Sequence, residues 1–202
     1  MEHLINLIKE VGYFSYLLLF IIIFLESFPL TFFLPGDSLL FTTGFLASQG
    51  HFSLPLLVIS LFVGSALGYI FSYKMGKKMR DYVLKSGDRF WFKKRHLDYT
   101  ERFYNKYGAK TIIVGRFVPI VRSFGPTLAG AVEMNYEKFV RYTIFGGIFW
   151  SGGVTLGGYY LGRAIPDAHL YLTPIIIGII VASLLPSVIE YIHVRRTKNS
   201  TI

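Results

Sequence analysis

Two hydrophobic segments of this chain are interrupted by residues that an unbroken helix does not tolerate. The interrupting residues are Pro29, Pro35 and Gly36 in the first segment, and Pro119, Gly125, Pro126 and Gly130 in the second. Proline has no backbone N–H to donate, and its ring clashes with the preceding turn of a helix. We therefore expect both segments to be broken helices and not straight membrane spans.

The composition indicates a membrane protein. Hydrophobic side chains make up 52% of the 202 residues and charged side chains only 16%, whereas soluble domains have about 25% charged residues. Stretches of about 20 apolar residues, the length that crosses a bilayer, occur at 52–73, 139–161 and 170–192. The sequence predicts one all-α polytopic domain with about three full spans. The absence of cysteine excludes disulfides, thiol nucleophiles and cysteine-ligated metals.

The positive charge lies mainly in one stretch. Between Lys77 and Lys110 there are eleven lysines and arginines against four acids. The positive-inside rule places this stretch, together with the basic C-terminal tail, in the cytoplasm. Aromatic residues alternate with the cations, which is typical of an amphipathic segment on anionic lipid headgroups. This pattern argues against nucleic acid as a partner.

Sidedness makes a specific prediction about the second broken segment. If residues 77–110 and the C-terminus are both cytoplasmic, the last two spans require residues 133–141 to be cytoplasmic as well. Residues 111–130 must then enter and leave the membrane on one side, as a re-entrant hairpin, which is tolerated only where it is buried in protein or lines a polar cavity. The first broken segment is expected to form the matching hairpin from the opposite face.

A weak internal repeat supports this symmetry, since Glu26-x-x-Pro29 aligns with Arg116-x-x-Pro119. The predicted order is a first repeat (1–76), the basic segment (77–110), a second repeat (111–163) and a last transmembrane helix (170–192). Inverted repeats with broken helices are typical of secondary transporters. The patterns Gly64-x-x-x-Gly68 and Gly153-x-x-x-Gly157 predict close helix packing. Trp150 is expected to lie at an interface or to pack the bundle.

Four ionisable residues lie on the broken segments: Glu26 and Asp37 on the first, Arg116 and Arg122 on the second. Charges inside a bilayer are costly unless they are paired or hydrated. A structural interpretation is a buried salt-bridge network joining the hairpins. A functional interpretation is that the arginines bind an anionic headgroup, while an acid in a poorly solvated site exchanges protons. The sequence offers no nucleophile with a nearby base, and its five scattered histidines predict no metal site or cofactor.

The residues resemble the DedA family, also described as SNARE-associated or VTT-domain membrane proteins. The resemblance rests on Glu26, on the run Phe33-Leu-Pro-Gly-Asp37, on Gly68-Tyr69, on the run from Gly115 to Arg122, and on Trp150. It implies two opposed re-entrant hairpins and transport of lipid phosphates driven by the proton motive force. The family's essential acids and arginines correspond to the four charged residues above. Ser123 departs from the threonine that is common beside the second arginine.

The resemblance leads us to expect a lipid-phosphate translocase that returns undecaprenyl phosphate from the outer to the cytoplasmic leaflet of a bacterial plasma membrane. The partners would be that lipid, protons, and anionic headgroups at the basic segment; a homo-oligomer is compatible with the sequence. Two alternatives stay open, a phospholipid scramblase and a proton-coupled transporter of a small ion or solute. An enzyme is not expected.

Overall fold

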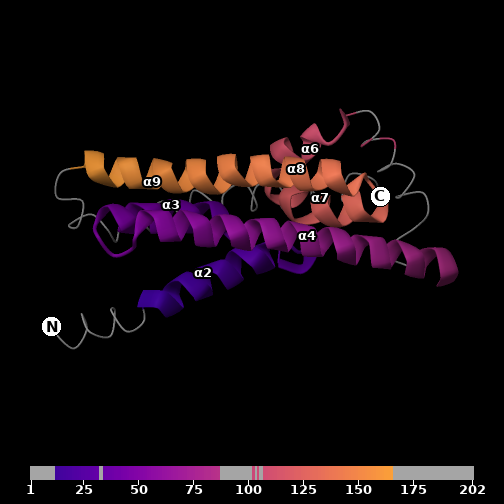
Figure 1. The fold of residues 1–202 in the computed structure, drawn as a ribbon, viewed down its shortest axis with the longest axis horizontal. Helices are drawn as coiled ribbons and strands as arrows, with labels where there is room; N and C mark the ends of the chain where they lie inside the picture. Colours follow the sequence, from indigo (N-terminus) through magenta and orange to yellow (C-terminus); the bar gives the residue numbers. More distant parts are fainter. Residues whose placement is uncertain (1–11, 32–33, 87–101, 103, 105–106, 166–202) are drawn as a thin grey trace, which may run out of the picture. The chain divides into compact units, whose positions relative to one another are not determined.

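The computed structural model describes residues 12–31, 34–86, 102, 104 and 107–165, and Figure 1 shows their arrangement along the chain. The elements are α2 (Gly12–Glu26), the 3₁₀ turn η1 (Pro29–Thr31), α3 (Gly36–Ser48), α4 (Leu54–Ser86), α6 (Lys110–Val114), the 3₁₀ turn η2 (Gly115–Phe117), α7 (Pro119–Ala131), α8 (Tyr136–Gly147), the π-helical turn η3 (Ile148–Gly152) and α9 (Gly153–Ala164). The described residues contain no strand, which confirms the helical class. The predicted last span, 170–192, and most of the basic segment lie outside them.

The chain forms two compact units. Unit 1 comprises Met1–Phe32 and Val58–Gly153, and unit 2 comprises Phe33–Leu57 and Val154–Ile202. Unit 1 therefore contains α2, nearly all of α4, and α6 to α8, whereas unit 2 contains α3 and nearly all of α9. The first broken segment is divided between the units, because α2 and η1 belong to unit 1 while α3 belongs to unit 2, whereas the second broken segment lies wholly in unit 1.

Among the described helices, α4 is the one long and apolar enough to cross a membrane. Its stretch Leu54–Arg80 has 27 residues and a mean hydropathy of 2.1. Ile59 and Phe71 on this helix are more than half exposed, whereas Leu61 and Tyr69 are buried. A helix that is apolar on its exposed face as well as its packed face fits a lipid environment. The helix continues to Ser86, past the expected end at Tyr73, so it carries the first basic residues on a rigid extension.

The residues of the predicted span at 139–161 are helical throughout, because α8, the π-helical turn η3 and α9 follow one another without a gap. Extra residues of this kind in a helix shift the direction of the side chains that they carry, and they occur frequently at functional sites. Trp150 lies in this turn and is only 2% exposed.

Glycines allow helices within unit 1 to cross at backbone contact. A side-chain carbon added at Gly130 on α7 would overlap the carbonyl of Tyr73 on α4. Reciprocally, a side-chain carbon added at Gly76 on α4 would overlap the carbonyl of Thr127 on α7. Only glycine permits this separation.

Unit 2 contains the same reciprocal crossing. Gly44 on α3 meets the carbonyl of Thr155 on α9, and Gly158 on α9 meets the carbonyl of Phe41 on α3. In each unit, the helix that follows a break, α7 or α3, thus crosses a helix of the other predicted repeat, α4 or α9, at backbone contact. The inverted repeat itself stays a prediction.

Replacing Gly130 with alanine should destabilise the protein. The added methyl group collides with backbone, which cannot move aside as a flexible side chain can, and overpacking of this kind costs about 1–3 kcal/mol. The matched control is Gly153→Ala, because the space around Gly153 is open among the described residues, contrary to the close packing expected from its sequence pattern. Thermal unfolding of the two detergent-purified variants should show a lower midpoint for Gly130→Ala alone.

Candidate functional site

The first break has its backbone groups satisfied by hydroxyl side chains. The end of a helix leaves carbonyls without N–H partners, and inside a membrane these must be paired within the protein. Three hydroxyls supply the bonds: Thr31 donates to the Leu25 carbonyl, Ser123 to the Glu26 carbonyl at 3.1 Å, and Ser72 to the Ser27 carbonyl at 2.6 Å. The bonds from α4 and α7 hold the end of α2, and with it Glu26, in a fixed place.

The second break lies at Val118. The chain there is extended, with φ −116° and ψ 112°, between η2 and Pro119, which occupies the first position of α7. Proline is favoured at that position because the missing N–H would have no helical partner. The break therefore lies two residues after Arg116 and about one helical turn before Arg122. Gly125, Pro126 and Gly130 lie inside α7 instead, so the expectation that they interrupt this segment is wrong, although Gly130 serves the crossing with α4.

Arg122 and Glu26 form a buried ion pair in unit 1. A terminal guanidinium nitrogen of Arg122 contacts the Oε1 atom of Glu26, and the side chains are 4% and 2% exposed. The guanidinium also lies over the indole of Trp150, 5.1 Å from the ring centroid. Stacking on an aromatic face adds to the attraction between charge and surroundings once water is excluded. Arg122 is thus held between a carboxylate and an aromatic ring.

Arg116 is held in a different way. It is fully buried, and its Nη1 and Nη2 atoms donate to the Ser65 hydroxyl at 2.9 Å and to the Thr143 carbonyl at 3.1 Å. Its guanidinium lies over the ring of Tyr69, 3.8 Å from the centroid. Its Nε atom has no hydrogen-bond partner, and no carboxylate pairs with Arg116, among the described residues. The guanidinium is therefore held only by neutral groups of the described chain.

Two glycines on α8 make room for Arg116. A side-chain carbon at Gly146 would lie 3.1 Å from both Cδ and Nε of Arg116, and one at Gly147 would lie 3.7 Å from Nη2. The contact at Gly146 is tighter than ordinary van der Waals contact, so a larger residue there would require Arg116 to shift, whereas the distance at Gly147 is an ordinary contact. Gly146 is therefore part of the arginine's site and not only a helix-packing feature.

The space around the ion pair is closed. It is lined by Ile23, Glu26, Ser27, Ser65, Tyr69, Arg122 and Trp150, and as lined by these residues it has no room for a water molecule. The two arginines share this surrounding, because Ser65 and Tyr69 contact Arg116 and also line the space beside Arg122. A ligand would have to displace the existing contacts to enter.

Asp37 lies in unit 2, in the first turn of α3. A carboxylate there is favoured by the partial positive charge of the helix N-terminus. The structure thus brings Glu26, Arg116 and Arg122 together within unit 1. The expected place of Asp37 opposite the arginines stays a prediction.

The residues that complete the site had weak signals in the sequence. Tyr69 and Trp150 belong to the family-like motifs, but an aromatic residue in a membrane helix is more often at an interface. Ser65 and Gly146 have no signal beyond being small residues in apolar segments. Among the described residues no group of three metal-binding side chains occurs.

Replacing Ser123 with alanine should weaken the join between α7 and α2. The Glu26 carbonyl would lose the bond from the Ser123 hydroxyl, and an unsatisfied buried acceptor costs about 1–3 kcal/mol. Ser123→Thr keeps a hydroxyl and is expected to behave like the wild type. A lower unfolding midpoint for both variants would contradict the role assigned to the hydroxyl and indicate a steric effect instead.

Comparison with known proteins identifies relatives over most of the chain. The VTT domain family matches residues 34–160. The chain is 40% identical over 197 residues to Protein DedA of Escherichia coli K12, covering 96% of this chain and 90% of that one. It is 39% identical over 184 residues to the uncharacterized membrane protein ML0287 of Mycobacterium leprae, with 90% and 81% covered. It is 33% identical over 152 residues to the inner membrane protein YqjA of Escherichia coli K12, with 73% and 68% covered. No solved structure matches.

Proposed function

Since the chain belongs to the DedA family of VTT-domain membrane proteins, we propose that it translocates a lipid phosphate, undecaprenyl phosphate, from the outer to the cytoplasmic leaflet of the bacterial plasma membrane. Transport is coupled to the proton motive force. Arg116 and Arg122 bind the phosphate, and Glu26 and Asp37 exchange the proton. The polyprenyl tail stays in the surrounding lipid.

The single observation that carries this proposal is that, among the described residues, Arg116 is buried with only neutral groups as its partners. A buried charge without a counter-charge is strongly unfavourable, and a second guanidinium, that of Arg122, borders the same residues. An anion that enters between them would supply the missing negative charge. Guanidinium groups suit phosphate because they stay charged and donate in a planar fork.

The charge of the ligand favours a phosphate monoester. A monoester carries roughly −1.5 to −2 charges at neutral pH, which matches two guanidinium groups. The phosphodiester of an ordinary phospholipid carries one negative charge and would neutralise only one of them. This argument ranks polyprenyl phosphate above phospholipid scrambling.

The ion pair of Arg122 and Glu26 gives the proton a defined task. In the structure, a terminal nitrogen of Arg122 pairs with Glu26. That nitrogen is then not available to donate a hydrogen bond to a phosphate oxygen. Protonation of Glu26 removes its negative charge and weakens its hold on the arginine. The phosphate then takes its place, while Trp150 keeps Arg122 in position. Loss of the proton restores the pair and expels the phosphate.

The topology that this cycle requires has two re-entrant segments that enter from opposite faces, with the basic segment in the cytoplasm. The breaks beside Glu26 and Arg116 support this topology, because each places a charged residue where helical backbone stops. The hydroxyl bonds at the first break also support it, because they satisfy buried carbonyls without water.

Leaflet exchange in proteoliposomes tests the proposed function. Purified protein is reconstituted with a short-chain fluorescent polyprenyl phosphate, and exchange is followed by quenching from outside, with and without an imposed pH gradient. We expect exchange that the gradient accelerates and that excess unlabelled polyprenyl phosphate inhibits more strongly than phosphatidylglycerol. Exchange of phospholipid without response to the gradient would assign a scramblase instead, and absence of any exchange would reject lipid translocation.

A further inference from the structure

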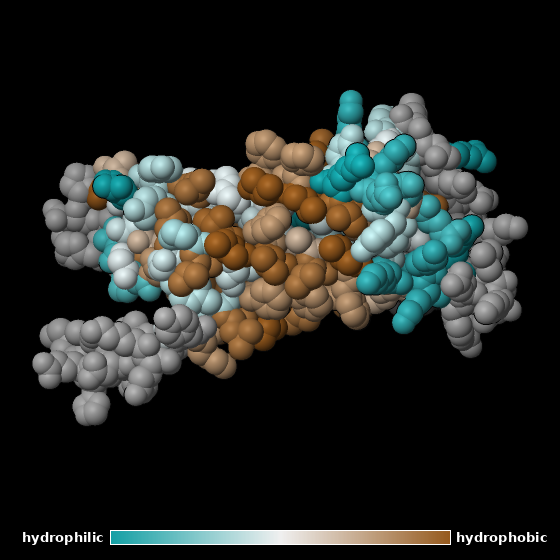
Figure 2. Space-filling model, in the orientation of Figure 1, coloured by the Kyte–Doolittle hydropathy of each residue, from teal (hydrophilic) through white to brown (hydrophobic). Residues whose placement is uncertain are grey.

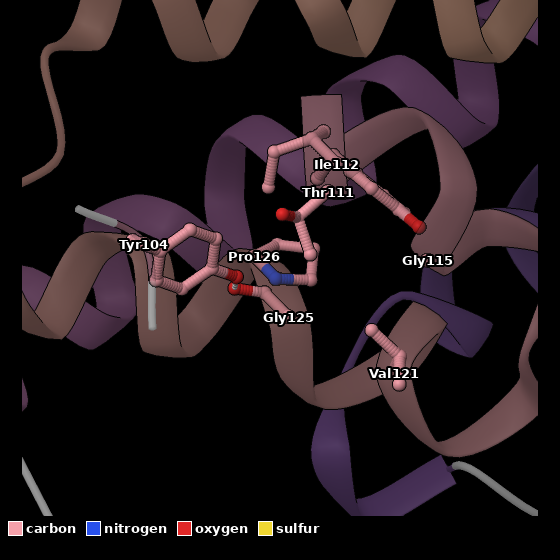
Figure 3. A pocket seen from close by; sticks show the side chains of 8 residues that line it. Tyr104, Thr111, Ile112, Gly115, Val121, Gly125 and Pro126 are labelled. Atoms are coloured by element: carbon pink, nitrogen blue, oxygen red, sulfur yellow. Dashed lines mark hydrogen bonds between the residues drawn. The ribbon is translucent and has the colours of Figure 1, made fainter. Parts of the chain in front are cut away.

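Three spaces in unit 1 adjoin one another through two tyrosines. The first is the closed space beside the ion pair of Glu26 and Arg122, and Tyr69 forms part of its wall. The second, drawn in Figure 3, is lined by Tyr69, Tyr104, Thr111, Ile112, Gly115, Val121, Gly125 and Pro126. The third is a hollow lined by Tyr104, Gly108, Ala109, Val132, Glu133, Met134, Asn135 and Lys138. Tyr69 is thus common to the first two spaces, and Tyr104 to the last two.

The three spaces differ in the room that they offer to water. The hollow has a volume of about 460 Å³, whereas the two inner spaces have no room for a water-sized molecule. A buried water needs about 10–15 Å³ for its centre to move in. The room for water therefore ends at Tyr104, which lines both the hollow and the second space.

Tyr104 is placed as a closing element. It is 7% exposed, and its hydroxyl donates to the carbonyl of Gly125 on α7 at 3.0 Å. Figure 3 shows the ring pointing toward Gly125 and Pro126, across the second space. Burial raises the pKa of Tyr104, and the nearby phenol of Tyr69 raises it further, so the hydroxyl stays protonated and remains a donor. One hydrogen bond is weak enough to open by thermal motion.

The hollow lies at the charged end of unit 1. Lys138 and Glu133 line it, and Glu133 pairs with Arg80 and Lys77 at the polar end of α4. Figure 2 shows hydrophilic side chains gathered over this end, where α4 ends and α6 to α8 lie, next to a hydrophobic band. This is the end that the positive-inside rule assigns to the cytoplasm.

We propose that water reaches the ion pair of Glu26 and Arg122 from this end, and that the proton of Glu26 leaves toward it, along a route that Tyr104 and Tyr69 close in turn. The inference rests on the proposed function in that the proton drives transport. When Tyr104 leaves the Gly125 carbonyl, water enters the second space; when Tyr69 moves, water reaches the carboxylate. The charged and titratable groups that face the route are Lys138 and Glu133 at the hollow, Tyr104 and Tyr69 along it, and Arg116, Arg122 and Glu26 at its inner end.

The geometry selects the proton, not the lipid headgroup, as the occupant of this route. The route runs through the interior of unit 1, between α4, α6 and α7, whereas a headgroup carries a long tail that must remain in lipid. The inner spaces have no room even for a water molecule, so a phosphate would need a far larger rearrangement than a proton carried by water. The proton and the lipid thus follow separate paths at the ion pair.

Cysteine accessibility tests the route without requiring transport. The chain contains no cysteine, so a single introduced thiol reports on one site. Ile112 is buried and lines the second space, whereas Leu61 is a buried aliphatic residue of α4 that lines none of the three spaces. Ile112→Cys and the control Leu61→Cys are exposed in inside-out membrane vesicles to a membrane-impermeant methanethiosulfonate reagent, each with and without Tyr104→Ala.

The expected result is slow labelling of Ile112→Cys that becomes about tenfold faster with Tyr104→Ala, since one tie and one side chain that close the route are removed. Tyr104→Phe, which loses only the hydrogen bond, should give an intermediate acceleration. Labelling of Leu61→Cys should not change. The proposal is overturned if neither change at Tyr104 accelerates Ile112→Cys, if Leu61→Cys accelerates equally, or if labelling occurs only in right-side-out vesicles. A failed lipid-exchange assay would leave this result unaffected, so the two proposals fail separately.

Discussion

Replacing Arg116 with glutamine should reduce lipid-phosphate exchange in proteoliposomes by roughly 10- to 100-fold. A charge-assisted hydrogen bond contributes about 1.5–3 kcal/mol, and each 1.4 kcal/mol corresponds to a factor of ten in affinity. Glutamine keeps polar atoms that can bond the Ser65 hydroxyl and the Thr143 carbonyl, but it carries no charge for the phosphate. Arg116→Lys keeps the charge without the planar fork and should fall between wild type and glutamine.

The control for this experiment is Arg163→Gln. Arg163 is an exposed arginine of α9 whose guanidinium lies 5.9 Å from the ring centroid of Tyr159. Arg163 is therefore an arginine with an aromatic contact, as Arg116 is, but it is not buried. Equal loss of exchange in both variants would show that net charge, and not the buried site, sets the rate.

Replacing Glu26 with glutamine should strongly destabilise the protein and make exchange independent of the pH gradient. Removing one partner of a buried ion pair costs about 3–5 kcal/mol, because the other charge loses its counter-ion. In the double variant Glu26→Gln/Arg122→Gln, the loss of stability should be smaller than the sum of the losses in the two single variants. The reason is that the double variant has no buried charge without its counter-ion. Chemical unfolding in detergent measures these differences.

An exposed ion pair in unit 1 provides the comparison. Glu133 pairs with Arg80 and Lys77, and its side chain is 44% exposed, so Glu133→Gln should cost at most about 1 kcal/mol. Equal effects of Glu26→Gln and Glu133→Gln would contradict the account of the buried pair. A Glu26→Gln variant that still responds to the gradient would remove Glu26 from the proton-coupling role.

The two breaks can be predicted from the sequence because proline acts locally on the backbone. Pro119 at the start of α7 and the end of α2 beside Glu26 follow from backbone chemistry that any context preserves. Pro126, by contrast, does not end a helix. One proline inside a helix bends it without ending it when neighbouring groups satisfy the backbone, and α7 continues through that residue.

The partners of the charged residues could not be predicted from the chain alone. The sequence offered two acids and two bases without an order of pairing, and the structure pairs Arg122 with Glu26 while Arg116 faces Tyr69, Ser65 and a carbonyl. Which acid pairs with which base depends on how each helix is rotated about its axis. That rotation is set by packing at small residues such as Gly146. The π-helical turn that carries Trp150 likewise has no sequence signature.

Native mass spectrometry of lipids bound to the purified protein tests the central claim, that the two buried arginines bind a lipid phosphate. Wild type, Arg116→Gln, Arg122→Gln and the exposed control Arg163→Gln are purified from the same bacterial membranes and compared. We predict that polyprenyl phosphate copurifies with wild type and Arg163→Gln and is lost from both buried-arginine variants. Equal retention in all four proteins would contradict the assignment of Arg116 and Arg122 as the phosphate site.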